Sequence, residues 1–405
     1  MHYRKLGNSD WKHIEERFEQ RLSGWKGKLL SVGGRLVLIN SVLSSLPMFM
    51  LSFFAIPKGV LKKLEYFRSR FFWQNDQYKK KYHLIKWDQI RQPKEQGGLG
   101  IIDLEVQNKC LLSKWLFKLA NEDGMWQRLI RNKYLKSKPL GCGLKKPGVS
   151  HFWAGIMEVK QDFLNLGSFN IGDGTQVRFW EDTWCGNQPL KLSYPALFSI
   201  VRKKEATVAE VMSTRPLNIS FRRGLHGERL LVWYELVSRV MSLELREGRD
   251  MFRWGLNKTG LFSVRSMYKH LINNGLKVSQ EIWRTKIPLK TKIFMWYIKR
   301  GVLLTKDNLA RRNWYGHQGC CFLVTMRVYN ISFSIAGAAA LIWTIWLQRN
   351  DCVLFRGTFW LRQWAKLQRH EEQVRLTCAA QNLEEAGLRV FNSFGWSAPA
   401  RISYE

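Results

Sequence analysis

Acidic residues are scarce in this sequence. Its 405 residues include 32 Asp and Glu against 65 Lys and Arg, which leaves a formal net charge of +33. The excess is not held in one tail, because 1–134 carries a net +13, 135–300 carries +15 and 301–405 carries +5. This pattern favours a protein that lies along a polyanion, and we expect a nucleic-acid partner, RNA or DNA, bound without sequence preference. The alternative is a generic basic surface neutralised by counterions.

Several chemical signatures are also missing. Seven Cys at irregular spacing, with no charged and apolar leader at Met1, disfavour a secreted disulfide framework, so we expect an intracellular protein, nuclear or cytoplasmic. The eight His form no His-x-x-x-His pair. Gly172-Asp173-Gly174 lacks the Gly-Lys-Ser/Thr that follows in a phosphate-binding loop. Cys142 has no His or acid nearby in the sequence to activate it as a nucleophile.

What the sequence does contain is apolar periodicity. Hydrophobic residues make up 45% of the chain, which indicates a folded protein. Asp10 is predicted to cap a helix that carries Trp11, Ile14 and Phe18 on one stripe, and Gly33-Gly34 is predicted to break it. These features predict a small helical bundle with a basic exterior.

Two stretches continue this bundle. Residues 36–56 hold no charge, and Pro47 should kink any helix there. After Pro57, residues 58–73 should form a helix. Its predicted apolar stripe consists of Val60, Leu64, Phe67 and Phe71. A second face of the helix is predicted to carry Lys58, Lys62 and Arg70.

Two β-hairpins are predicted farther along. In 167–184, Asp173-Gly174 supplies a tight turn, and Val177 and Phe179 alternate with polar residues. In 251–272, a strand pair is predicted to turn at 258–260 and to lead into a helix capped by Ser263. Residues 289–300 begin a basic and aromatic helix after Pro288.

The order of these motifs resembles the C-terminal part of reverse transcriptases from plant non-LTR (LINE-type) retrotransposons. The matching stretches are "LSGWKGKLLSVGGRLVLINSVLSSLPMFMLSFFAIP", "KWDQIRQPKEQGGLGIIDLEVQNKCLLSKWLFKL", "IGDGTQVRFWEDTW", "FSVRSMYKHL" and "IWRTKIPLKTKIFMWYIKRGVLLTKDNLARRNW". They occur in the family's order and cover most of 1–322. The resemblance implies a thumb-like helical region followed by a reverse-transcriptase zinc-binding region, with the polymerase palm upstream.

Polymerase chemistry is not expected from these residues. The family's palm carries metal-binding aspartates in a Tyr-x-Asp-Asp turn, and no Tyr-x-Asp-Asp occurs here. Nucleotidyl transfer needs carboxylates that hold two metal ions. Asp182, beside Glu181 in a family motif, is predicted to be part of a surface acidic pair rather than a catalytic residue. We therefore predict no catalytic residue and no enzymatic activity.

The zinc region departs from the family pattern. After "RRNW" the family continues with Cys-x-x-Cys, then a His and a Cys. Cys320 matches the first ligand, but Leu323 replaces the second, and His317 and Cys321 alone do not complete a site. Structural zinc needs four ligands in a tetrahedron. We therefore expect no zinc or other cofactor, and a degenerate remnant of the site.

Aromatic residues interleaved with basic ones indicate where nucleic acid would bind. The predicted contact residues are Lys58, Lys62, Lys63, Arg70, Lys290, Lys292, Arg311 and Arg312. Two other functions stay open. The chain could be the accessory part of an active RNA-directed DNA polymerase completed in trans, or a membrane-associated protein anchored through 36–56. No small-molecule substrate is expected.

The predicted fold is mainly α with short antiparallel β-hairpins, an α+β arrangement. Residues 1–135 should form a thumb-like and connector helical region, and 136–250 a mixed α/β linker region. Residues 251–322 should form a truncated reverse-transcriptase zinc-binding region, and 323–405 a divergent helical tail.

Overall fold

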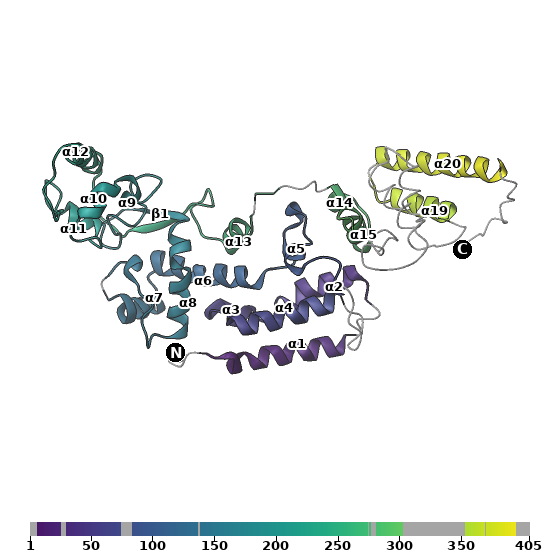
Figure 1. The fold of residues 1–405 in the computed structure, drawn as a ribbon, viewed down its shortest axis with the longest axis horizontal. Helices are drawn as coiled ribbons and strands as arrows, with labels where there is room; N and C mark the ends of the chain where they lie inside the picture. Colours follow the sequence, from purple (N-terminus) through teal and green to yellow (C-terminus); the bar gives the residue numbers. More distant parts are fainter. Residues whose placement is uncertain are drawn as a thin grey trace. The chain divides into compact units, whose positions relative to one another are not determined.

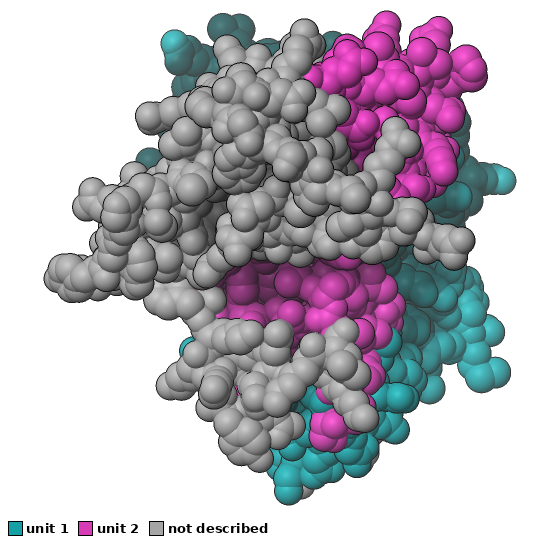
Figure 2. Space-filling view, turned by 90° about the vertical axis from the view of Figure 1, so that its right-hand side faces the viewer, with its two compact units in different colours: residues 1–22, 42–67, 102–273 teal, residues 23–41, 68–101, 274–405 magenta. Residues whose placement is uncertain are grey.

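The computed structural model describes residues 6–25, 30–73, 83–136, 138–273, 275–276, 281–302, 353–368 and 370–393. Two compact units divide the chain (Figure 2). Unit 1 comprises 1–22, 42–67 and 102–273, and unit 2 comprises 23–41, 68–101 and 274–405. The described residues are mainly helical with two short antiparallel strands, which confirms the predicted fold class.

Unit 1 contains most of the helices and both strands (Figure 1). Three of its elements, α1, η3 and α4, also extend across the boundaries between the units. The elements are η1 Asn8–Trp11, α1 Lys12–Gly24, η3 Ile39–Leu43, α3 Met48–Phe53, α4 Lys58–Trp73, α6 Leu104–Asn121, α7 Met125–Ile130, η5 Arg131–Leu135, η6 Leu140–Cys142, α8 His151–Leu164, β1 Gly167–Asn170, α9 Leu190–Ser193, α10 Pro195–Ile200, α11 Val208–Met212, α12 Glu228–Met241, β2 Met251–Trp254 and α13 Val264–Ile272.

Unit 2 is helical throughout its described residues. Its elements are α2 Val32–Leu38, α5 Trp87–Arg91, η4 Lys94–Gln96, α14 Glu281–Arg284, α15 Leu289–Lys299, α19 Val353–Ala365 and α20 His370–Ser393. Helices α19 and α20 lie side by side (Figure 1). Leu361 and Trp364 of α19 pack with Leu376 and Ala380 of α20 in a small apolar core.

The apolar stripe predicted for the first helix is confirmed, since Trp11, Ile14 and Phe18 are all buried. Asp10 is predicted to cap the helix that begins at Trp11, but it lies inside η1. Its carboxylate accepts a hydrogen bond from the backbone N–H of Gly7, the N-cap of η1, at 2.8 Å. The predicted break at Gly33-Gly34 is wrong. Both glycines lie inside α2, where a Cβ on Gly33 would come within 3.2 Å of the Lys290 backbone nitrogen, so Gly33 permits close packing of α2 on α15.

The uncharged stretch 36–56 is not one helix. It passes through α2, η3 and a run of turns, and Pro47 lies at the N-cap of α3, as expected for a residue that interrupts a helix. Asn108 of α6 holds the end of this stretch by donating to the carbonyls of Leu51 and Phe54 and accepting from the Ile56 N–H. Within the described residues, no helix combines the length and the apolar character needed to cross a bilayer.

The two predicted hairpins are wrong, because their first strands pair with each other. Strand β1 runs antiparallel to β2, with Phe169 opposite Phe252 and Gly167 opposite Trp254. Residues 171–184 form bends and turns instead of a returning strand, with an isolated bridge between Arg178 and Thr207. Ser263 does cap α13 as predicted, since its hydroxyl accepts the Ser266 N–H. The long-range pair forms because Phe163 of α8 packs against both Phe252 and Trp254.

Two polar side chains fix β2 in this position. The Asn121 side chain at the end of α6 donates to the Phe252 carbonyl at 2.9 Å and accepts the Phe252 N–H at 2.7 Å. The buried Asp250 carboxylate accepts the N–H groups of Gly172, Gly174 and Gln176 at 2.8, 3.0 and 2.9 Å. Buried backbone donors need such partners. The Asp250 carboxylate therefore holds the loop that replaces the predicted hairpin through three backbone hydrogen bonds.

A glycine turn, 97–100, organises unit 2. Gly97 and Gly100 have φ values of +84° and +70°, and a Cβ on Gly98 would lie 2.0 Å from the Gln92 carbonyl oxygen. The carbonyl of Gly97 accepts hydrogen bonds from the Trp296 indole and the Arg300 guanidinium of the α15 region. Residues 97–100 thus form a tight turn to which α15 is attached.

Candidate nucleic-acid interface

Helix α4 presents part of its predicted basic face to solvent, because the third residue of that face, Arg70, is half-buried. Lys58 and Lys62 are exposed, and residues four apart lie on the same side of a helix. Lys63 is also exposed, but its ammonium lies 2.5 Å from the Glu15 carboxylate of α1. The hydrogen bond that Lys63 donates to Glu15 raises the pKa of the Lys63 ammonium. Lys58 and Lys62 are therefore the α4 cations best placed for a phosphate backbone.

The opposite side of α4 is apolar with one unexpected charge. Of the predicted apolar stripe, Val60, Leu64 and Phe71 are buried and Phe67 is half-buried. Arg68, four residues after Leu64, is fully buried among them, and Arg70 is half-buried. Sequence reasoning missed Arg68, although its spacing from Leu64 placed it on the apolar stripe.

A second arginine is buried in unit 2. The Arg35 guanidinium donates to the Phe72 carbonyl at 3.1 Å, and burial lowers the pKa of this group. Such arginines raise the net charge without adding to a binding surface. The formal charge therefore overstates the charge that a partner meets.

The basic residues of α15 have separate environments. Lys290 is exposed. Lys292 is half-buried and donates to the Trp283 carbonyl at 2.9 Å, while the Lys94 ammonium lies 4.9 Å from the Trp283 ring centroid. Burial, and then repulsion from Lys94, lowers the pKa of Lys292. Lys290 and Lys292 belong to unit 2, and Lys58 and Lys62 of α4 belong to unit 1.

The rest of the predicted site lies outside the described residues. This holds for Arg311 and Arg312 and for the zinc remnant His317, Cys320, Cys321 and Leu323. Among the residues that the structure describes, no three His, Cys, Asp or Glu side chains come together in a way that would hold a metal ion.

The acidic pair Glu181-Asp182 is part of the fold. Asp182 is 3% exposed rather than on the surface as predicted. Its carboxylate accepts the Arg178 guanidinium at 2.7 Å and the Arg178 backbone N–H at 2.8 Å, and Glu181 pairs with the same guanidinium. Burial lowers the pKa of Arg178, but the hydrogen bonds that Arg178 donates to Asp182 and the negative charges of Asp182 and Glu181 keep this pKa above its usual value. Asp182 is therefore committed to an ion pair.

The loop around Cys142 is likewise structural. The Lys160 ammonium donates to the carbonyls of Gly141 and Gly143 at 2.6 and 2.7 Å. Burial, and then the nearby Arg178, lowers the pKa of Lys160. Burial raises the pKa of the Cys142 thiol. A raised pKa disfavours the thiolate, so this geometry does not create a nucleophile.

Comparison with known proteins identifies a matching family model and two similar plant proteins. A family model described as zinc-binding in reverse transcriptase matches residues 262–343. A putative ribonuclease H protein of Arabidopsis thaliana is 29% identical over 325 residues, which cover 76% of this chain and 51% of the relative. An uncharacterized mitochondrial protein of Arabidopsis thaliana is 31% identical over 145 residues, which cover 35% of this chain and 92% of that protein. This chain belongs to the plant retroelement reverse-transcriptase-related proteins.

The predicted resemblance is therefore confirmed at the level of the family. The chain spans about half the length of the ribonuclease H-named relative. The matched zinc-binding segment begins in the region predicted for it and extends beyond Leu323.

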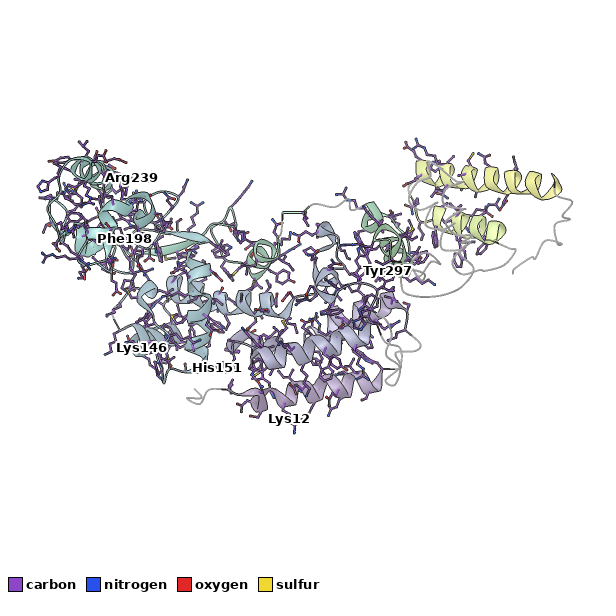
Figure 3. All side chains as sticks on the ribbon, in the orientation of Figure 1. Lys12, Lys146, His151, Phe198, Arg239 and Tyr297 are labelled. Carbon is purple, nitrogen blue, oxygen red and sulfur yellow. The ribbon has the colours of Figure 1, made fainter. Side chains whose placement is uncertain are left out.

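Sequence reasoning missed one basic group in this retroelement protein. Val201 and Phe221 form an isolated antiparallel bridge, which brings "VRKK" of 201–204 beside "FRR" of 221–223. The first run directly follows α10, and the second run precedes α12. Figure 3 labels Phe198 on α10 and Arg239 on α12. The runs of two or three cations were visible in the sequence, but their pairing was not.

Proposed function

We propose that this retroelement-derived chain binds RNA or DNA without sequence preference and carries no nucleotidyl-transfer activity in residues 1–405. The observation that supports the proposal is the outward basic face of α4. Lys58 and Lys62 are exposed on a helix whose other side is anchored in the core of its unit. A rigid row of lysines suits a phosphate backbone, which carries no sequence information.

The absence of catalysis is proposed from the sequence. No Tyr-x-Asp-Asp turn occurs in these residues. Among the described acids, Asp182 and Asp250 are buried and bound to protein groups. We expect no primer extension by the homogeneous chain on RNA or DNA templates with magnesium or manganese. Extension only after addition of a separate palm domain would favour the accessory role in an RNA-directed DNA polymerase.

Binding is tested by fluorescence anisotropy with labelled oligonucleotides of unrelated sequence. The variant K58Q/K62Q should weaken binding similarly for every sequence, and each lost contact should lower the log–log salt slope by about 0.7–0.9. The control K109Q/K114Q removes two exposed lysines of α6.

Three results would count against this proposal. The wild-type chain could fail to bind at low salt, its affinity could be independent of salt, or the α4 variant and the control could lose affinity equally. Any of these would show that the α4 face only solvates the helix.

The degenerate zinc remnant leads to a separate expectation. Because Leu323 stands where the family has its second cysteine, purified protein should hold no stoichiometric structural zinc. Elemental analysis after dialysis against a weak chelator measures this. Retained zinc that disappears in the Cys320→Ser variant would contradict the expectation.

A further inference from the structure

We infer that the bridged segments 201–204 and 221–223 form a second phosphate-binding surface for a nucleic-acid strand. We name this surface the basic bridge, and its cations are Arg202, Lys203, Lys204, Arg222 and Arg223. The inference rests on the proposed nucleic-acid binding and adds a site to it.

Backbone hydrogen bonds set the spacing of two arginines. The Arg202 N–H donates to the Ser220 carbonyl at 3.0 Å, and the Arg222 N–H donates to the Ile200 carbonyl at 2.8 Å. Arg202 and Arg222 are therefore diagonal neighbours across an antiparallel bridge. Such neighbours lie about 7–8 Å apart and point to the same face. The face opposite to Val201 and Phe221 thus carries both guanidinium groups.

The charges on this surface are mostly unneutralised. Lys203 is held 2.7 Å from the Glu210 carboxylate, and this contact lowers the pKa of Glu210. In the described part of the chain, Arg202, Arg222 and Arg223 take part in no salt bridge, and all three are exposed. Guanidinium groups can bind phosphate oxygens through two parallel hydrogen bonds.

The buried side of the bridge packs against the core of unit 1. Val201 is 2% exposed, and the Phe221 ring packs edge-on against Trp233 of α12 with centroids 5.2 Å apart. The Arg202 Nε donates to the Phe221 carbonyl at 3.1 Å, which orients the guanidinium and leaves its terminal nitrogens for a ligand. Ordering that is already present in the free protein reduces the entropy lost on binding.

One aromatic ring lies beside the cations. The Lys204 ammonium sits 4.7 Å from the ring centroid of Phe198, which is half-buried on α10. Basic grooves that bind single strands combine phosphate contacts with such rings. A site of this kind fits a nucleic-acid backbone better than it fits a small anion, because its cations are spread along two segments.

The test compares two triple variants of the full chain. R202Q/R222Q/R223Q removes the free arginines of the basic bridge, and K12Q/R17Q/R21Q removes three exposed cations of α1. Circular dichroism first establishes that both are folded. Anisotropy with labelled oligo-dT and with an unrelated RNA oligonucleotide then gives affinity and salt slope.

We expect the bridge variant to lose affinity on the order of 10²-fold at about 0.1 M salt, and its salt slope to fall by about 2, since each single-strand phosphate contact contributes about 0.7. The α1 control should lose less than about 5-fold. Equal losses in the two variants, with a wild-type chain that binds, would overturn the basic bridge and leave the proposed function standing. A wild-type chain that does not bind would overturn both.

Vesicles provide the remaining comparison. If the bridge variant keeps its affinity for oligonucleotides but loses binding to vesicles rich in phosphatidylserine, then the surface serves an anionic membrane and the inference is wrong. Retained vesicle binding alongside lost oligonucleotide binding supports it.

Discussion

The Asp250 loop and the basic bridge are both turn-rich and charged, yet they use charge in opposite ways. In the loop, 171–182, the Asp250 and Asp182 carboxylates are buried and occupied by backbone N–H groups and by Arg178. In the basic bridge, three arginines are exposed and take part in no described salt bridge. The charges of the first segment therefore stabilise the fold, while the arginines of the second remain exposed.

Removal of the Asp250 carboxylate should have the largest effect on the free energy of unfolding. Asp250→Ala leaves three backbone N–H groups without a charged acceptor, and we expect the free energy of unfolding to fall by about 5 kcal/mol. Urea denaturation followed by tryptophan fluorescence measures the change. The matched control is Asp173→Ala, where an exposed carboxylate accepts only from Thr175, and about 1 kcal/mol is expected. Equal effects would mean that the loop does not depend on Asp250.

The buried ion pair should give the next largest effect. Asp182→Ala leaves the buried Arg178 guanidinium without its main partner, and we expect a loss of about 3–4 kcal/mol. Glu181→Ala, on the more exposed partner of the same guanidinium, should reduce stability by about 1 kcal/mol or less. The double variant R178M/D182L should be more stable than Asp182→Ala, because both buried charges are removed together and only the partly exposed Glu181 loses its ion pair. A less stable double variant would argue against the ion-pair account.

The pH dependence of stability compares a buried cysteine, Cys110, with an exposed one, Cys378. Burial raises the pKa of the Cys110 thiol to about 12, so the unfolded chain loses this proton first as pH rises. The Cys110 contribution to stability is therefore intact below the ordinary pKa of 9.0 and is lost between that value and about 12. From pH 8 to 11 the stability advantage of the wild type over Cys110→Ala should shrink by about 2–3 kcal/mol. Cys378→Ala, at an exposed position on α20, should show no such trend.

The smallest expected effect is on the stability of the basic bridge. Replacing Arg202, Arg222 or Arg223 singly by Gln should change the free energy of unfolding by no more than about 0.5 kcal/mol, because exposed side chains without ion pairs contribute little. Denaturation midpoints of the three variants measure this. A loss above about 2 kcal/mol in any of them would show that the bridge, like the Asp250 loop, uses its charge for folding.

Local patterns predicted the helical elements well. The stripes containing Ile14, Phe18, Val60 and Leu64 are buried because helical periodicity places them on one face. Pro47 interrupts the helices of the uncharged stretch because proline has no backbone N–H, and this follows from the identity of a single residue. The outward positions of Lys58 and Lys62 follow from the same periodicity.

Long-range contacts were beyond such patterns. Both predicted hairpins chose the nearest partner in the sequence, whereas the structure pairs β1 with β2. The choice depends on contacts that Phe163, Asn121 and Asp250 make with residues far away in the sequence. The burial of Asp182 and Arg68 was missed for the same reason, since a charged residue is read as exposed until its buried surroundings are known.

By itself, the sequence determined the helical class, the family and the sign of the charge, because periodicity, motif order and composition are properties of the chain. Only the tertiary structure decided which charges are available. Burial depends on residues that are far apart in the sequence, and it withdraws Arg35, Arg178 and Asp182 from the surface. The same folding joins 201–204 to 221–223 through backbone hydrogen bonds, and so turns two short basic runs into one surface.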